Sequence, residues 1–372
     1  HWNQAFLLRS PHNLDYLLLK KSIHQLLIHH DALRLRFTPE NSEWQQVMTS
    51  PDDVVPVSRV DLSKFTNVEQ KVAIQSTATK LQASLNLSEG PLMRVALFEL
   101  GSHAPSYLLI IIHHLAVDGV SWRILLEHLE FLYNQLSHNQ IVKLPPKTTS
   151  YRHWAQKLDE YAQSDKLQQE LPFWLAMQEK HQEPLPVDYP SGINNNTVLS
   201  TDIIPVGLNV QKTEMLLKQV PKAYQTEIND ILLTALAQAV TQWTETSTLL
   251  VDLEGHGREA IFDDTDLSRT VGWFTSIFPV SLSLERNSQP GEMLKSIKEQ
   301  LRNIPNRGIG YGILRYLKKD SETLKKLRAL PKPELNFNYL GPVSYTHLTL
   351  PTIVRECRCR GWPGRDGGGG GG

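Results

Sequence analysis

The order in which helix and strand patterns follow one another is the feature of this sequence that most constrains its fold. Hydrophobic periodicity in the first half predicts a helix, three strands and a second helix, at 13–30, 32–37, 91–98, 106–112 and 121–136. The second half repeats the beginning of this order, with a helix and three strands at 228–240, 248–254, 276–284 and 334–339. Because a chain of 372 residues exceeds the usual size of a single core, the repeat predicts two α/β lobes with a cleft between them.

The boundaries of these lobes follow from composition. The segment 140–150 contains Pro145-Pro146 and a polar end, which is typical of a connection. We therefore predict lobes at 1–150 and 151–342, of the α/β class with an α+β two-layer sandwich in each. The remaining residues, 343–372, lack periodicity and end in six glycines, so they are predicted to be a non-native or disordered tail.

Two predicted helix starts depend on capping side chains. Asn13 precedes the first helical pattern and Ser121 precedes the second, and both residue types accept hydrogen bonds from free backbone N–H groups.

The composition excludes several classes of function. Lysine plus arginine (38) nearly balances aspartate plus glutamate (39), which predicts no nucleic-acid partner. The most apolar run, 108–112, is too short to cross a bilayer, so no membrane association is expected. Both cysteines, Cys357 and Cys359, lie in the tail, so the body has no thiol nucleophile and no cysteine zinc site. The scarcity of cysteine predicts a cytoplasmic setting.

A pair of histidines stands at the exit of the most apolar predicted strand. Strand 106–112 runs into His113-His114, and a helix follows. Such a junction places side chains at the mouth of a cleft, and imidazole is well suited to move protons near neutral pH. Asp118 can orient a histidine or pair with an arginine, and Gly119 allows a turn that other residues would strain. A lone histidine here is more often structural than catalytic, so the residues alone leave both interpretations open.

A second polar loop follows the strand 248–254. There Glu254 can point into a cleft, while Gly255 and Gly257 let the backbone turn tightly. By itself this short string is also typical of an ordinary polar loop. Neither loop contains a glycine-rich nucleotide motif, a lysine context for pyridoxal phosphate or a metal-ligand cluster, so we expect no bound cofactor and no metal.

Five strings together carry a resemblance to a known family. They are HHLAVDGVSWRIL at 113–125, EGHGRE at 254–259, RTVGWFT at 269–275, GIGYG at 308–312 and NFNYLG at 336–341. The first resembles the HHxxxDG signature of the condensation superfamily of nonribosomal peptide synthetases, which is related in fold to chloramphenicol acetyltransferase. All five are similar to its epimerization branch, and the resemblance covers about residues 1–341. It also implies that a first strand of the family is missing before residue 1.

This resemblance implies a fold and a reaction. The fold is a pseudo-dimer of two chloramphenicol-acetyltransferase-like lobes with an active-site tunnel between them. The reaction is L-to-D inversion at Cα of an aminoacyl or peptidyl thioester on a peptidyl carrier protein, which supplies the 4'-phosphopantetheine arm. Adenylation and condensation domains of the same assembly line are the further partners it implies. The implied catalytic residues are His114 and Glu254, on facing walls. The implied supporting residues are His113, Asp118, Gly119, Arg258, Asn338 and Tyr339.

Chemistry fits these roles without distinguishing them. A thioester acidifies the Cα–H, so a side-chain base can remove that proton and a second group, or the same group after exchange, can return one to the opposite face. Which of His114 and Glu254 is the base stays open, and Asp118 and Arg258 are expected to pair between the lobes. Two alternatives remain: a condensation domain with His114 as base, and an inactive superfamily member that only recruits a partner.

Overall fold

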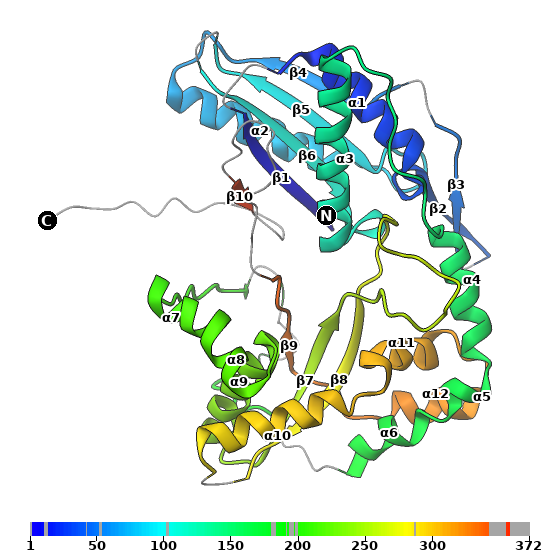
Figure 1. Cartoon of the computed structure of the whole chain (residues 1–372), viewed down its shortest axis with the longest axis vertical. Coiled ribbons are helices and arrows are strands. Elements are labelled where there is room, and N and C mark those ends of the chain that lie inside the picture. The colour runs from blue at the N-terminus through cyan, green and yellow to red at the C-terminus, as the bar shows by residue number, and fades with distance from the viewer. Residues whose placement is uncertain are drawn as a thin grey trace, which may run out of the picture. The chain divides into compact units, whose positions relative to one another are not determined.

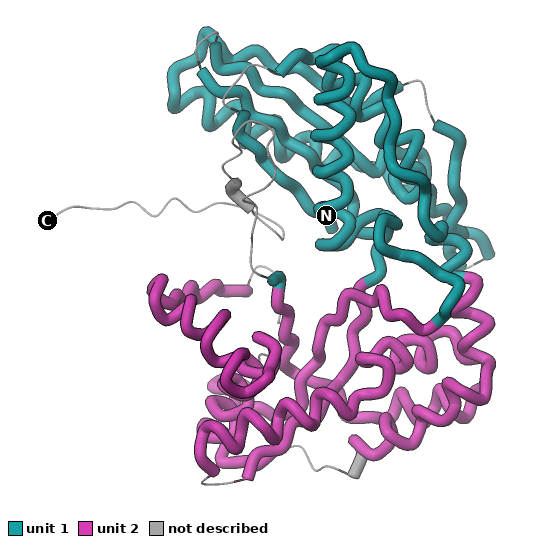
Figure 2. The backbone as a smooth tube through the Cα atoms, in the orientation of Figure 1, with its two compact units in different colours: residues 1–155, 262–274, 340–372 teal, residues 156–261, 275–339 magenta. Residues whose placement is uncertain are grey.

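The computed structural model describes residues 2–341, apart from 11–13, 42, 52–53, 102–103, 180–183, 191, 193–196, 198–199 and 286–287, together with 355–357. The chain divides into two compact units (Figure 2). Unit 1 contains residues 1–155, 262–274 and 340–372, and unit 2 contains 156–261 and 275–339. This division differs from the predicted lobes in one functional respect, because the segment 262–274 belongs to unit 1.

Unit 1 is built on a sheet with strand order β10-β1-β6-β5-β4 (Figure 1). Neighbouring strands are antiparallel except for β4 and β5, which are parallel. The strands are β1 (Asn3–Ser10), β4 (Val57–Asp61), β5 (Met93–Glu99), β6 (Ser106–His113) and β10 (Arg355–Cys357). The sequence predicted β5 and β6 to within two residues, but it did not predict β1, β4 or β10.

Helices cover both faces of this sheet. The alternating residues Val95, Leu97 and Ile110 pack with α1 (Tyr16–His29) and α3 (Gly119–Ser137) in one core. Residues of opposite parity, such as Phe98 and Ile111, pack against α2 (Asn67–Ala83) in another. The strand predicted at 106–112 is thus buried on both faces, and α2 adds a third layer to the predicted two.

The helix starts and one strand of unit 1 correct the sequence analysis. Asp15 caps α1 by accepting a hydrogen bond from the Leu18 N–H, while Asn13 lies outside the described residues. Asp118, not Ser121, caps α3. The predicted strand 32–37 begins as a 3₁₀ turn, and β2 (Leu35–Glu40) pairs instead with β3 (Glu43–Met48). The alternation failed there because Arg36 is buried, donating from Nε to the Glu89 carbonyl at 2.8 Å.

Unit 2 contains a three-stranded sheet of order β8-β7-β9, in which β8 is antiparallel and β9 parallel to the central strand. The strands are β7 (Thr248–Gly255), β8 (Ser276–Ser283) and β9 (Leu335–Phe337). The predicted long helix is confirmed as α9 (Ile228–Thr244). The other helices of the second half are α4 (Tyr151–Ala162), α5 (Asp165–Gln168), α6 (Leu171–Leu175), α7 (Val210–Glu214), α8 (Val220–Tyr224), α10 (Pro290–Arg302), α11 (Ile309–Tyr316) and α12 (Ser321–Arg328).

The predicted tail is described by the structure only in small part. Of 343–372, the structure describes only Arg355–Cys357, which forms β10 antiparallel to β1. These three residues therefore differ from the predicted disorder, because the outer edge of β1 offers backbone groups that any extended segment can pair with.

Among the described residues, every helix is too short or too polar to cross a membrane.

Candidate active site

The histidine loop begins where β6 ends at His113. A 3₁₀ turn over His114–Ala116 follows, and α3 begins at Gly119. The Leu115 N–H donates to Nδ1 of His113 at 3.2 Å, so this ring stabilises the turn. Burial, together with the charge of the neighbouring His114, lowers the pKa of His113. His113 thus holds the loop in place as a neutral ring.

His114 is held from three sides within unit 1. Its backbone N–H donates to the Trp2 carbonyl at 2.8 Å, and its Nε2 lies 2.9 Å from Nε2 of Gln4. Trp273 packs against the ring with 4.7 Å between centroids. The other ring nitrogen, Nδ1, is buried and has no hydrogen-bond partner among the described residues. The imidazole is therefore fixed in place, and its second nitrogen is buried without a hydrogen-bond partner among the described residues.

Asp118 joins the histidine loop to a later part of the chain. Its side chain is almost fully buried, at 3% exposed. Oδ1 accepts from the Ser121 N–H at 2.7 Å, which caps α3, and Oδ2 accepts from the Phe274 N–H at 3.1 Å. The expected pair with Arg258 involves residues of different units and stays a prediction.

Gly119 does not have the conformation expected from the sequence. It is the exposed first residue of α3, it lacks a positive φ, and a Cβ added to it would meet no atom within 4 Å. The prediction that the turn needs glycine at this position is wrong, because Asp118 completes the turn before the helix starts.

The RTVGWFT string completes the histidine loop. Ser121 Oγ donates to the Gly272 carbonyl at 2.9 Å and accepts from the Gly272 N–H at 3.1 Å. Arg269 donates from Nη2 to Glu127 at 3.0 Å, which fixes the start of the string on α3. The sequence pointed to this string only through the family resemblance. No spacing or periodicity signal indicates that Ser121 and Gly272, 151 positions apart, would pack together.

Glu254 lies at the exit of β7 in unit 2 and is half-buried. The register of β7 and β9 pairs Leu253 with Phe337, so Glu254 and Asn338 are the next residues on adjacent strands. The Asn338 amide donates from Nδ2 to Oε2 of Glu254. The backbone pairing therefore places these two residues side by side, and their membership of one functional site stays a prediction.

Tyr339 lies beyond the end of a strand. The strand expected at 334–339 ends at Phe337, so neither Asn338 nor Tyr339 belongs to it. Tyr339 is half-buried beyond the strand, and its role in a site stays a prediction.

The loop after Glu254 is a closed turn. Gly257 has a φ of +66°, as the sequence predicted for a tight turn, and the Arg258 N–H donates to Nδ1 of His256 at 3.0 Å. Nε2 of His256 lies 3.4 Å from the Glu259 carboxylate. At Gly255, an added Cβ would lie 2.9 Å from Oγ of Ser276 on β8. The glycines therefore serve both the turn and the close packing of β7 on β8.

The GIGYG string forms the start of α11. Gly308 has a φ of +88°, and a Cβ there would lie 2.3 Å from the Phe278 ring. A Cβ on Gly310 would lie 1.9 Å from Oε2 of Glu170, a buried carboxylate whose Oε1 accepts from Asn306 at 2.6 Å. Burial raises the pKa of Glu170. This string is therefore a close-packing element behind β8, and no pattern in the sequence indicated Glu170.

One group of described side chains lies close enough to hold a metal ion. Donor atoms of His29, His30 and His128 lie within 4.8 Å of one another. Arg269, which can only donate, approaches Nε2 of His128 to 2.6 Å and thereby places the proton of that neutral ring on Nδ1. Nδ1 lies 2.9 Å from Nε2 of His30 and donates to it. A metal ion would have to displace both hydrogen bonds.

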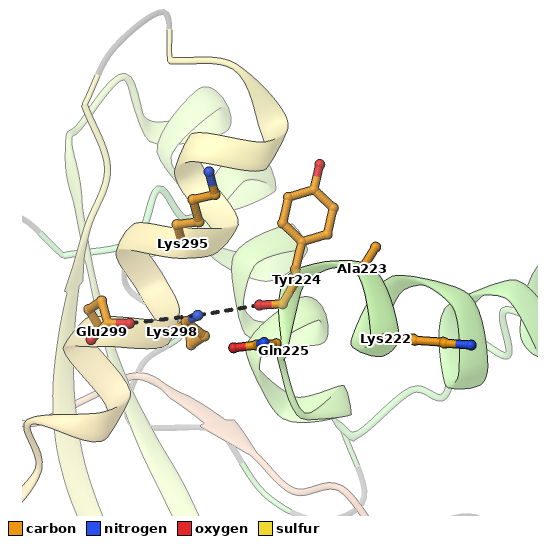
Figure 3. A pocket seen from close by; sticks show the side chains of 7 residues that line it. All are labelled: Lys222, Ala223, Tyr224, Gln225, Lys295, Lys298 and Glu299. Atoms are coloured by element: carbon orange, nitrogen blue, oxygen red, sulfur yellow. Dashed lines mark hydrogen bonds and ion pairs between the residues drawn. The ribbon is translucent and has the colours of Figure 1, made fainter.

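A basic hollow of about 570 Å³ lies in unit 2 between α8 and α10 (Figure 3). Its lysines are Lys222, Lys295 and Lys298, and the last donates to the Tyr224 carbonyl at 3.3 Å. None of the predicted site residues lines it. The hollow is therefore separate from both candidate loops.

Comparison with known proteins places these loops in context. A family model described as the condensation domain matches residues 1–351. A linear gramicidin synthase of Brevibacillus parabrevis is 50% identical over 343 residues, which are 92% of this chain and 4% of that protein. Gramicidin S synthase 1 of Brevibacillus brevis is 40% identical over 346 residues, which are 92% of this chain and 31% of that protein. The chain thus spans only a small part of these relatives.

Two solved structures differ in how much sequence they share with the chain. The epimerization domain from the third module of tyrocidine synthetase B is 40% identical, with a TM-score of 0.83 over 91% of this chain and 75% of that one. The first condensation domain of the CDA synthetase is 17% identical, with a TM-score of 0.69 over 96% of this chain and 81% of that one. The second likeness shows a common fold alone.

Proposed function

This chain belongs to the condensation domain family, and within that family we propose that it is an epimerization domain. Its reaction would be the L-to-D inversion, at Cα, of an aminoacyl or peptidyl thioester in nonribosomal peptide synthesis. The observation that carries this proposal is Glu254, a half-buried carboxylate at the exit of β7 that accepts a hydrogen bond from Asn338. Removal of a Cα proton needs such a base, whereas amide-bond formation involves no Cα proton.

The chemistry assigns a task to each loop. Glu254, as carboxylate, takes the Cα proton, and the C–H electron pair forms the enolate whose charge rests on the thioester oxygen. His114, fixed by Gln4 and Trp273, has a buried Nδ1 with no hydrogen-bond partner among the described residues, and this nitrogen would serve the substrate. Inversion requires that a proton then return to the opposite face of Cα. Catalysis of this kind needs side chains only, so we propose no bound cofactor or metal in the reaction.

The substrate and the partners are part of the same proposal. A thioester is the form in which a carrier protein presents an amino acid, so the partner would be a peptidyl carrier protein with its 4'-phosphopantetheine arm. Adenylation and condensation domains would supply and use the carried residue. The 40% identity to an epimerization domain supports this branch.

Deuterium incorporation tests the proposal. The chain would be mixed in deuterated water with a carrier protein loaded with an L-aminoacyl thioester, and the released amino acid analysed by chiral chromatography and mass spectrometry. We expect a mixture of L and D residues with deuterium at Cα. Unlabelled L residue from folded protein would contradict the proposal. Formation of an amide on adding a second loaded carrier would support the condensation alternative instead.

A further inference from the structure

The side chain of Gln4 lies between two rings of the histidine loop. Its Oε1 accepts a hydrogen bond from Nε1 of Trp122 at 2.7 Å, and its Nε2 lies 2.9 Å from Nε2 of His114. Gln4 is placed by the pairing of β1 with β6, where it stands opposite Ile112, two residues before His114. One amide therefore connects the indole of α3 to the candidate catalytic imidazole.

The direction of these hydrogen bonds follows from the donor. An indole N–H can only donate, so the amide atom that faces Trp122 must be the oxygen. The amide NH₂ group then faces His114 and donates, which requires that Nε2 of His114 accept. A neutral imidazole that accepts at Nε2 carries its proton on Nδ1. The pair of contacts thus selects one tautomer of His114.

Packing prevents this arrangement from reversing. Trp122 is 3% exposed, and its ring lies 4.4 Å from that of Phe6 in an edge-to-face contact. If the Gln4 amide turned over, its NH₂ group would face the indole N–H, and a buried donor would be left without an acceptor. A His114 ring protonated at Nε2 would likewise face the amide with two donors. The indole therefore controls the imidazole through the amide.

We propose that Gln4 and Trp122 are positioning residues that hold His114 in its Nδ1–H tautomer, so that it serves as a hydrogen-bond donor to the thioester oxygen. This inference rests on the proposed function and sharpens it. Glu254 takes the Cα proton, the C–H pair becomes the C=C bond of the enolate, and the carbonyl pair moves to oxygen. The Nδ1–H of His114 donates to that oxygen and keeps its own proton, so the proton that returns to the opposite face of Cα comes from solvent. Donors placed where negative charge develops are among the strongest contributors to catalysis.

The tautomer can be measured without any activity. Long-range proton–nitrogen correlation spectra of the ¹⁵N-histidine-labelled chain distinguish Nδ1–H from Nε2–H rings, and His114→Ala identifies the signals of interest. We expect the Nδ1–H pattern for His114 at neutral pH. An Nε2–H pattern in the unsubstituted chain would overturn the inference.

Substitution of Gln4 tests its control of the ring. Gln4→Glu keeps an acceptor for Trp122 but replaces the amide donor facing Nε2 with a second acceptor, so the proton should move to Nε2. We expect deuterium incorporation at Cα to fall by about 100-fold through kcat, with KM little changed, as for loss of an oxyanion donor. Gln4→Met, which removes both polar atoms at similar length, should leave a mixture of tautomers and an intermediate rate. Gln135→Glu, on the far part of α3, is the matched control and should change neither.

The outcomes distinguish failure of this inference from failure of the proposed epimerization function. A Gln4→Glu chain with unchanged His114 signals, or with a shifted tautomer and an unchanged rate, contradicts the positioning role. If the unsubstituted chain incorporates no deuterium while the tautomer responds as expected, the proposed function fails and so does the reaction role of His114. The hydrogen-bond assignment would then stand alone.

Discussion

The two candidate loops are built alike but are held differently. Each follows the exit of a buried strand, β6 in unit 1 and β7 in unit 2, and each is completed by a string from later in the chain. RTVGWFT contributes to the histidine loop a backbone N–H on Asp118, a backbone pair on Ser121 and an indole on His114. To the glutamate loop, 254–259, NFNYLG contributes the side-chain amide of Asn338.

This difference separates structural from chemical roles within the motifs. In the histidine loop the carboxylate, Asp118, is buried and occupied as a helix cap, so its removal should affect folding first. In the glutamate loop the carboxylate, Glu254, is half-buried and contacts an exposed amide, so its removal should affect the reaction first. Substitution of Asp118 is therefore expected to lower stability, whereas substitution of Glu254 is expected to lower the reaction rate.

The largest expected effect concerns Glu254. Glu254→Gln keeps the shape and the contact with Asn338 but cannot take a proton, so inversion should fall by about 10² to 10⁴-fold. Thermal unfolding should be almost unchanged. The measurement is the initial rate of D-residue formation on a loaded carrier protein, beside a melting curve.

A glutamate elsewhere controls for the change in charge. Glu299→Gln, at the basic hollow of unit 2, should keep the full rate because no candidate site residue lies there. If Glu254→Gln kept more than a tenth of the activity, the carboxylate would not be the base.

The next effect concerns Asp118 and is one of stability. Asp118→Ala removes the cap of α3, worth about 1 kcal/mol, and leaves the buried Phe274 N–H without this acceptor, which costs about 1–3 kcal/mol more. We expect the free energy of unfolding to fall by about 2–4 kcal/mol in a urea titration. Asp118→Asn keeps one carbonyl oxygen and should lose roughly half as much. A loss below about 1 kcal/mol would mean that RTVGWFT is anchored elsewhere.

Much of the fold is predictable because strong periodicity survives in long elements. The helix at 228–240 and the strands at 106–112 and 248–254 are confirmed, since each carries its own apolar pattern. The strand at 32–37 was partly wrong because Arg36 is buried through hydrogen bonds rather than exposed. Strand β1 was missed although it supplies Gln4 to the site, because its partner lies about a hundred residues away.

The candidate site was also predictable only as far as local patterns reach. Residue types and a family resemblance placed His114 and Glu254 at strand exits, and the structure has His114 in the 3₁₀ turn after β6 and Glu254 as the next-to-last residue of β7. What they could not provide is the set of contacts between distant segments: Gln4 with His114, Phe274 with Asp118, and Asn338 with Glu254. Such contacts depend on strand order and register, and no local pattern in one sequence records those.

Two glycine substitutions test the difference between the two loops through a smaller effect on stability. Gly257 has a φ of +66°, so Gly257→Ala should destabilise unit 2 by about 1–2 kcal/mol. Gly119 is an exposed first residue of a helix with free space around its Cα, so Gly119→Ala should change the free energy of unfolding by less than about 0.5 kcal/mol. Both are read from thermal melts of the two variants. Equal losses would show that the histidine loop is strained at Gly119 after all.

The smallest effect is one of pH, and it has opposite signs in the two units. In unit 1, burial and then the charge of Arg269 lower the pKa of His128 from 6.5 to about 4. Between these values the unfolded chain binds a proton that the folded chain does not, so stability present above pH 6.5 is lost as the pH falls toward 4. In unit 2, burial raises the pKa of Glu170, so its unfavourable ionisation is relieved as the pH falls.

Histidine substitutions make this contrast measurable. His128→Gln keeps an acceptor for Arg269 and a donor for His30 but cannot titrate. Relative to the unsubstituted chain, this variant should lose about 1 kcal/mol less stability between pH 7 and pH 5, by urea titration at each pH. Acidification should therefore weaken the contact of Arg269 with α3, which holds RTVGWFT, before it affects the packing of Glu170 behind β8. Hydrogen exchange at pH 5 should show faster opening at 269–274 than in β7, and the reverse order would contradict the assignment of the titrating group to unit 1.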